Sequence, residues 1–238
     1  MVTFVLIHGA GSDGWYWHLV EPELRAAGHH AIAVDLPCDE DGAGLAEYAD
    51  AVLAAVEAGG QPSGDVVLVA QSMGGFVAPI VATRMPVSLI VLVAAMTPRV
   101  GESPGDWWTN TGHDDARRDA EAAGGIAADD WDPVALFLHD VPADVAAESV
   151  HRVREQSGTP FQEPWPLEAW PDVPTRFLLC RDDRLFPAPF QRRLARERLG
   201  IVPDEMDGGH LPALARPQEL ASRLLAYVAP ETRGRTAS

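Results

Sequence analysis

The stretch Val66-Val67-Leu68-Val69-Ala70-Gln71-Ser72-Met73-Gly74-Gly75 decides how this chain folds. Its run of apolar, mostly β-branched residues stops at a serine between small residues, and a helix-competent segment follows. This pattern is typical of a nucleophile elbow, in which a buried strand delivers a serine into a tight turn before a helix. Strand and helix pack closely there, so small residues are needed two positions before and after Ser72. Ala70 and Gly74 fill these positions, although glycine is more usual at the first.

The composition predicts a soluble globular protein with a large core. The chain has 238 residues, of which 47% are hydrophobic and 22% charged. Its formal net charge is −17, and every one of the 18 basic residues is an arginine. A surface this acidic argues against nucleic acid or an anionic membrane as a partner.

Cysteine content and hydropathy set the expected compartment and cofactors. Cys38 and Cys180 are the only cysteines, and the chain has no CxxC or Cys/His spacing that suits a metal. The first residues predict a strand and not a signal peptide. No apolar run reaches the roughly 18 to 20 residues of a membrane span. We therefore expect a cytoplasmic protein that uses neither a metal nor an organic cofactor.

Strands and helices alternate along most of the chain, which predicts an α/β fold with a mainly parallel sheet covered by helices on both faces. The expected strands are Thr3–Ile7, Ala31–Val34, Val66–Ala70, Leu89–Ala94, Thr175–Cys180 and Ile201–Met206. The expected core helices are Trp15 or Trp17 to Ala27, Leu45–Ala58, Gly74–Arg84 with Pro79 kinking it or making its first turn irregular, Pro189–Leu199 and Pro217–Val228.

The alternation breaks between residues 97 and 172. This segment holds five of the seven tryptophans together with acidic clusters, and only two helices are expected in it, near 133–138 and 143–154. Disordered segments are poor in aromatic residues, so we predict a helical lid inserted into a core formed by residues 1–96 and 173–230. The loop 59–64 and the tail 231–238 are expected to be irregular.

An aspartate and a histidine each follow a later predicted strand, which gives the order Ser, Asp, His along the chain. Asp183 comes after the strand 175–180, and His210 comes after the strand 201–206. Sites in open α/β sheets form at the carboxyl ends of strands, so Ser72, Asp183 and His210 are expected to meet. Asp182 is the alternative acid. Asp35, which ends the second strand, is expected to be structural.

Four ordered motifs resemble the α/β-hydrolase fold superfamily over nearly the whole chain: Val5–Ala10, Ala70–Gly75, Asp183–Pro187 and Gly208–His210. Within it, the chain resembles the small esterase and hydroxynitrile lyase branch. The resemblance implies a six-stranded sheet in the order 2-1-3-4-5-6. Hydroxynitrile lyases of that branch use a lysine near the catalytic histidine, whereas Leu211 follows His210 here, so we expect no cyanohydrin cleavage.

Chemistry assigns a role to each predicted site residue. His210 takes the proton of Ser72 and returns it to the leaving group, while Asp183 orients the imidazole. The backbone amides of Met73 and Ala10 are expected to form the oxyanion hole. Among the other histidines, His8 is expected to brace the oxyanion loop, and three are expected at the surface: His113, His139 and His151.

These residues predict a serine hydrolase that cleaves small to medium hydrophobic carboxylic esters through an acyl-serine intermediate. Four aromatic residues are expected to line the substrate pocket: Trp107, Trp108, Trp131 and Phe186. The alternatives are a non-catalytic small-molecule binding protein and a carbon–carbon bond hydrolase on the same fold. Exposed lid tryptophans could equally form a homodimer surface.

Overall fold

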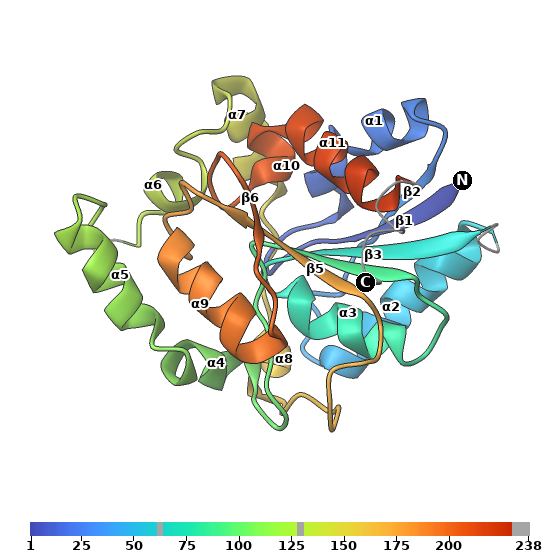
Figure 1. Cartoon of the computed structure of the whole chain (residues 1–238), viewed down its shortest axis with the longest axis horizontal. Helices are drawn as coiled ribbons and strands as arrows, with labels where there is room; N and C mark the ends of the chain where they lie inside the picture. Colours follow the sequence, from blue (N-terminus) through green and yellow to red (C-terminus); the bar gives the residue numbers. More distant parts are fainter. Residues whose placement is uncertain (61–63, 128–130, 230–238) are drawn as a thin grey trace, which may run out of the picture.

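The computed structural model of the chain describes residues 1–60, 64–127 and 131–229. The predicted tail 231–238 lies outside these ranges, as do residues 61–63 of the predicted loop. One parallel sheet has the strand order β2-β1-β3-β4-β5-β6, which confirms the predicted fold (Figure 1). The strands are β1 (Val2–Ile7), β2 (His30–Ala33), β3 (Asp65–Gln71), β4 (Leu89–Val93), β5 (Thr175–Cys180) and β6 (Asp204–Met206).

Successive side chains of each strand point to opposite faces of the sheet, and each face has its own hydrophobic core. In β1, Phe4 and Leu6 pack on one face, against α1 (Glu21–Ala26), α10 (Pro212–Ala215) and α11 (Pro217–Val228). Val5 and Ile7 pack on the other, against α2 (Leu45–Ala58), α3 (Gly74–Ala82) and α9 (Ala188–Leu199). Figure 1 shows the helices on both sides of the sheet. Each such buried side chain contributes about 1.5 to 3 kcal/mol.

Residues 97–172, which we call the insertion segment, contain more helix than the sequence predicts. The expected helices appear as α6 (Pro133–Phe137) and α7 (Ala143–Arg152). Three others were not expected: α4 (Pro104–Asn110), α5 (His113–Ala122) and α8 (Thr159–Gln162). No strand occurs in the described part of this segment. Its helices α4 to α7 lie near the carboxyl ends of the strands, and its last residues lead to the start of β5 (Figure 1). The α5 sequence is mostly polar, so its apolar periodicity is too weak to announce a helix.

Three core elements differ from their predicted form. The helix expected from Trp15 or Trp17 to Ala27 is a 3-10 turn, η1 (Gly14–Trp17), followed by α1, which has Pro22 in its first turn. The strand β6 starts at Asp204 and not at the predicted Ile201, because Pro203 has no amide hydrogen to donate. The helix α3 runs through Pro79 but ends at Ala82, two residues before its predicted end.

One buried ion pair joins the insertion segment to the core. Arg198 of α9 and Glu102 have side chains only 1% and 4% exposed, and both guanidinium ends bind the carboxylate, Nη2 at 2.9 Å from Oε1. The same carboxylate accepts hydrogen bonds from the Arg99 amide and from Asn110. Arg198 also donates to the Thr97 carbonyl, so the pair fixes the start of the insertion segment.

We predict that Arg198→Met lowers the free energy of unfolding by about 3 to 5 kcal/mol, because Glu102 is then left charged and unpaired in the interior. Urea unfolding followed by circular dichroism measures this change. The matched control Arg25→Met breaks an exposed pair with Glu21 and should cost about 1 kcal/mol or less. Equal losses in the two variants would contradict the prediction.

Candidate active site

Ser72 sits in a backbone conformation that few side-chain-bearing residues adopt. Its φ is 52°, in the left-handed region, which costs of order 1 to 3 kcal/mol unless the surroundings impose it. The turn is held by neighbours: the Ser72 amide donates to the Val93 carbonyl at 3.3 Å, and the Ser72 carbonyl accepts from the Met96 and Gly75 amides. A Cβ on Gly75 would run into the Met96 carbonyl, so a second glycine is required beside Gly74.

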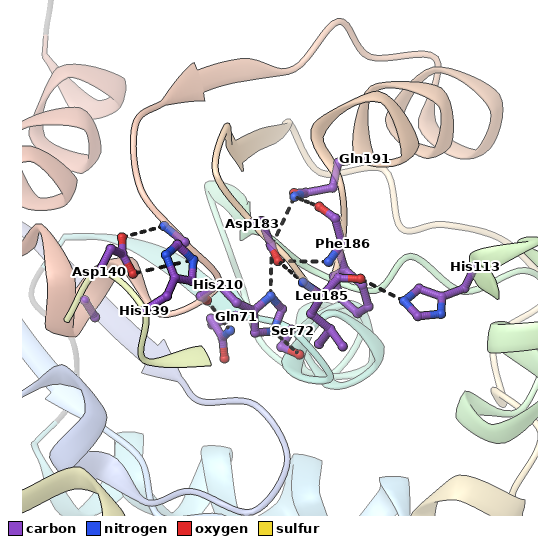
Figure 2. A network of polar contacts seen from close by, with 12 residues as sticks. Gln71, Ser72, His113, His139, Asp140, Asp183, Leu185, Phe186, Gln191 and His210 are labelled. Atoms are coloured by element: carbon purple, nitrogen blue, oxygen red, sulfur yellow. Dashed lines mark hydrogen bonds and ion pairs between the residues drawn. The ribbon is translucent and has the colours of Figure 1, made fainter. Parts of the chain in front are cut away.

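The three predicted residues meet in one chain of hydrogen bonds (Figure 2). Nε2 of His210 lies 3.1 Å from Oγ of Ser72, and Nδ1 lies 2.8 Å from Oδ2 of Asp183. A carboxylate only accepts hydrogen bonds, so Nδ1 carries the proton and Nε2 is free to accept the serine proton. Asp182 instead binds the Gly208 amide through its own carboxylate and does not reach the imidazole.

The loop after β1 packs directly on the elbow. A Cβ on Gly9 would lie 2.6 Å from Oε1 of Gln71 and 2.8 Å from Cβ of Ser72, so only glycine fits. His8 is buried and neutral: burial lowers its pKa, outweighing the Gly9 carbonyl and Asp35. It accepts the Leu36 amide at Nε2 and donates from Nδ1 to the Gly9 carbonyl. It therefore ties this loop to the end of β2.

Two backbone amides beside Ser72 have no partner in the described part of the chain. Neither the Met73 amide, just after the serine, nor the Ala10 amide, in the β1 loop, donates a hydrogen bond to any described residue. Donors left open at this point are available to a ligand oxygen. Asp35, by contrast, is occupied in the way expected of a structural residue, because it accepts the Gly14 amide at 2.7 Å.

Two of the three histidines expected at the surface are not there. His113 of α5 is fully buried, and its Nε2 donates to the Leu185 carbonyl at 2.8 Å (Figure 2). The side chain of His139 is only 11% exposed and lies beside Asp140. His151 is exposed as expected. The prediction failed for the first two because tertiary contacts, and not local sequence, decide whether an isolated histidine is covered.

The insertion segment holds three of the four loops that carry the site, namely those after β1, β5 and β6. At the loop after β1, the Arg154 amide donates to the Gly11 carbonyl and the Gly11 amide donates to Oε1 of Gln156, both at 3.0 Å. His113 holds the loop after β5 through Leu185. At the loop after β6, the Gly209 amide donates to Asp140 at 2.7 Å (Figure 2).

Aromatic rings surround His210, but the four predicted pocket residues are not equivalent. Phe186 is buried and its ring centre lies 4.9 Å from that of His210. Trp107 is also buried, in the core beneath Phe186, Trp108 is partly covered, and Trp131 is 55% exposed. Phe137 of α6, which the sequence did not single out, lies 5.6 Å from the His210 ring. A cavity of about 500 Å³ opens between α5, α9 and the loop after β5, and none of the four predicted residues lines it.

No cluster of His, Cys, Asp or Glu among the described residues suits a metal ion. In the same part of the chain, every helix is too short or too polar to span a bilayer.

Comparisons with known proteins agree on the fold. Residues 4–223 match the model of the alpha/beta hydrolase family. The chain is 28% identical to Methylesterase 7 of Arabidopsis thaliana over 93% of this chain and 94% of that protein. It is 39% identical to Esterase PIR7B of Oryza sativa subsp. japonica over 43% of this chain and 41% of that protein. A pyrethroid hydrolase structure from Sphingobium faniae JZ-2 superposes with a TM-score of 0.76 at 23% identity, covering 98% of this chain and all of that one.

We predict that acid weakens this fold through its buried histidines. Burial lowers the pKa of His113, as it does that of His8, so these groups take up protons in the unfolded state before the folded state. The free energy of unfolding is therefore undiminished above the ordinary histidine pKa of about 6.5, and it decreases as the pH falls below that value.

The change is measured by urea unfolding at about pH 7.5 and about pH 5, where each such histidine contributes at most about 1.4 kcal/mol per pH unit. His113→Gln should lose less stability between the two than the wild type, whereas the exposed-site control His151→Gln should match the wild type. An unchanged slope in His113→Gln would contradict the prediction.

Proposed function

The chain belongs to the alpha/beta hydrolase family, and on that premise we propose that it is a serine esterase acting on small to medium hydrophobic carboxylic esters. The observation that carries the proposal is the unbroken hydrogen-bond chain from Oγ of Ser72 through His210 to Asp183. A serine hydroxyl is a weak nucleophile unless a base within hydrogen-bond reach accepts its proton. Esterases among the relatives, Methylesterase 7 and Esterase PIR7B, support the same reaction.

The geometry supports a two-step acyl transfer. Oγ of Ser72 attacks the ester carbonyl carbon as its proton passes to Nε2 of His210. The carbonyl oxygen becomes an oxyanion, which the open amides of Met73 and Ala10 bind. His210 then gives its proton to the leaving alkoxide, and the acyl group stays on Ser72. Water, deprotonated by the same imidazole, attacks the acyl carbon; the bond from that carbon to Oγ of Ser72 breaks, His210 returns the proton to Oγ, and the carboxylic acid leaves.

The side chains next to the reacting atoms favour an apolar substrate. The rings of Phe137 and Phe186 both pack against the His210 ring in T-shaped contacts. Trp108 extends the aromatic surface from Phe186 toward the exposed Trp131. Aromatic rings of this kind bind hydrocarbon acyl or aryl groups by burying their surface. The insertion segment supplies all of these residues except Phe186, so it acts as the lid that selects the substrate.

We predict that Ser72→Ala removes the hydrolysis of p-nitrophenyl acetate and butyrate, because the variant lacks the hydroxyl that is hydrogen-bonded to His210. Release of p-nitrophenol measures it, with an unfolding curve as the control for folding. A fluorophosphonate should label the wild type at Ser72 and leave the variant unlabelled. Turnover by Ser72→Ala at the wild-type rate would refute the assignment. Labelling absent from folded wild type would favour a binding protein.

A second prediction tests the amide of Ala10. Ala10→Pro removes that N–H and should lower kcat by about 100- to 1,000-fold, the usual cost of one oxyanion donor. The matched control Ala10→Gly keeps the amide and should retain activity. The KM for p-nitrophenyl butyrate and the unfolding midpoint, measured in parallel, show whether binding and folding survive. Full activity in a folded Ala10→Pro variant would remove Ala10 from the oxyanion hole.

A further inference from the structure

The carboxylate of Asp183 is buried and saturated with hydrogen bonds. It is 4% exposed. Oδ1 accepts the amides of Leu185 at 2.9 Å and Phe186 at 2.8 Å. Oδ2, the oxygen that faces His210, accepts one further donor, Nε2 of Gln191 at 3.2 Å (Figure 2).

We propose that Gln191 is a positioning residue for the acid of this site. It stands in the first turn of α9, and its Nε2 bridges Oδ2 of Asp183 and the Phe186 carbonyl, the latter at 2.6 Å. One amide thus ties the carboxylate to the loop that carries it and keeps Oδ2 turned toward His210. The inference rests on the proposed function, because it assigns Asp183 the role of orienting the base.

The orientation of the Gln191 amide follows from its neighbours. Both groups that it meets, a carboxylate and a carbonyl, are acceptors, so only the nitrogen end can face them. The oxygen end is then buried: Oε1 of Gln191 has no hydrogen-bond partner among the described residues, and the residue is only 2% exposed. A buried acceptor without a donor destabilises the fold.

The unpaired oxygen helps to distinguish two possible roles of Gln191, stabilising the fold and supplying a donor to Asp183. An apolar side chain of similar length would remove the unpaired Oε1 but would leave the Phe186 carbonyl without its donor, so the two effects on stability offset each other. The Leu185 and Phe186 amides would still hold Oδ1 of Asp183, whereas Oδ2 would lose the donor that Gln191 supplies. Substitution of Gln191 should therefore lower activity without a matching loss of stability.

The test compares Gln191→Met, which removes the donor at nearly constant length, with Gln191→Asn, which keeps the amide but sets it back by one carbon. The exposed-site control on the same helix is Arg196→Gln. For p-nitrophenyl butyrate, kcat should fall about 10- to 100-fold in Gln191→Met and less in Gln191→Asn, with KM within about twofold of wild type because the substrate does not touch Gln191. The control should match the wild type.

Two further measurements exclude a merely structural role. The free energy of unfolding of Gln191→Met should match that of the wild type, because loss of the unpaired Oε1 offsets loss of the donor to the Phe186 carbonyl. The downfield proton resonance of the hydrogen bond from Nδ1 of His210 to Asp183 should move upfield or broaden in Gln191→Met and persist in Arg196→Gln. Wild-type kcat in Gln191→Met overturns the proposal, as does a parallel loss of kcat and stability with the resonance intact.

The proposed function fails separately. If the wild type shows no Ser72-dependent ester hydrolysis, the esterase assignment is wrong. The resonance still reports whether Gln191 orients the Asp183–His210 pair, and an unchanged resonance in both Gln191 variants would then refute the positioning role.

Discussion

The left-handed backbone of Ser72 is the constraint on which the rest of the structure depends. A serine holds φ of 52° only where its neighbours leave no other choice. The carbonyl of Val93 and the amide of Met96 provide that restraint from the end of β4, while Gly75 gives the strand end room to approach. Ala94, also left-handed with φ of 43°, lies between Val93 and Met96, directly after β4. The sheet therefore fixes the direction of the serine before any other site residue contributes.

Features imposed by local sterics could be predicted from the sequence. Ser72 between Ala70 and Gly74 indicates both the end of a strand and a turn. The parallel strands are continuous apolar runs because helices cover the sheet on both faces. Asp183 and His210 were found because each follows a strand, and the carboxyl ends of parallel strands share one edge of the sheet. These inferences need only neighbours in the chain and the topology of the sheet.

Features imposed by distant contacts could not be predicted. His113 lies in a polar, acidic stretch, and nothing near it in the sequence shows that Leu185 and the surrounding rings bury it. Trp107 and Trp131 look alike in the sequence, yet one is wholly buried and the other 55% exposed. Phe137 and Gln191 gave no signal because an apolar residue and an amide in predicted helices are ordinary there.

The insertion segment is hydrogen-bonded to the loops after β1, β5 and β6 through Gln156, His113 and Asp140, and ion-paired to α9 through Glu102. It is therefore not an exchangeable module. A chimera that received the corresponding segment of a relative would inherit new pocket walls but also lose these anchors, so substrate preference and catalytic alignment would change together. Under the proposed function, a change of selectivity that keeps the site aligned would come from single side chains that face the site, with the anchoring residues held constant.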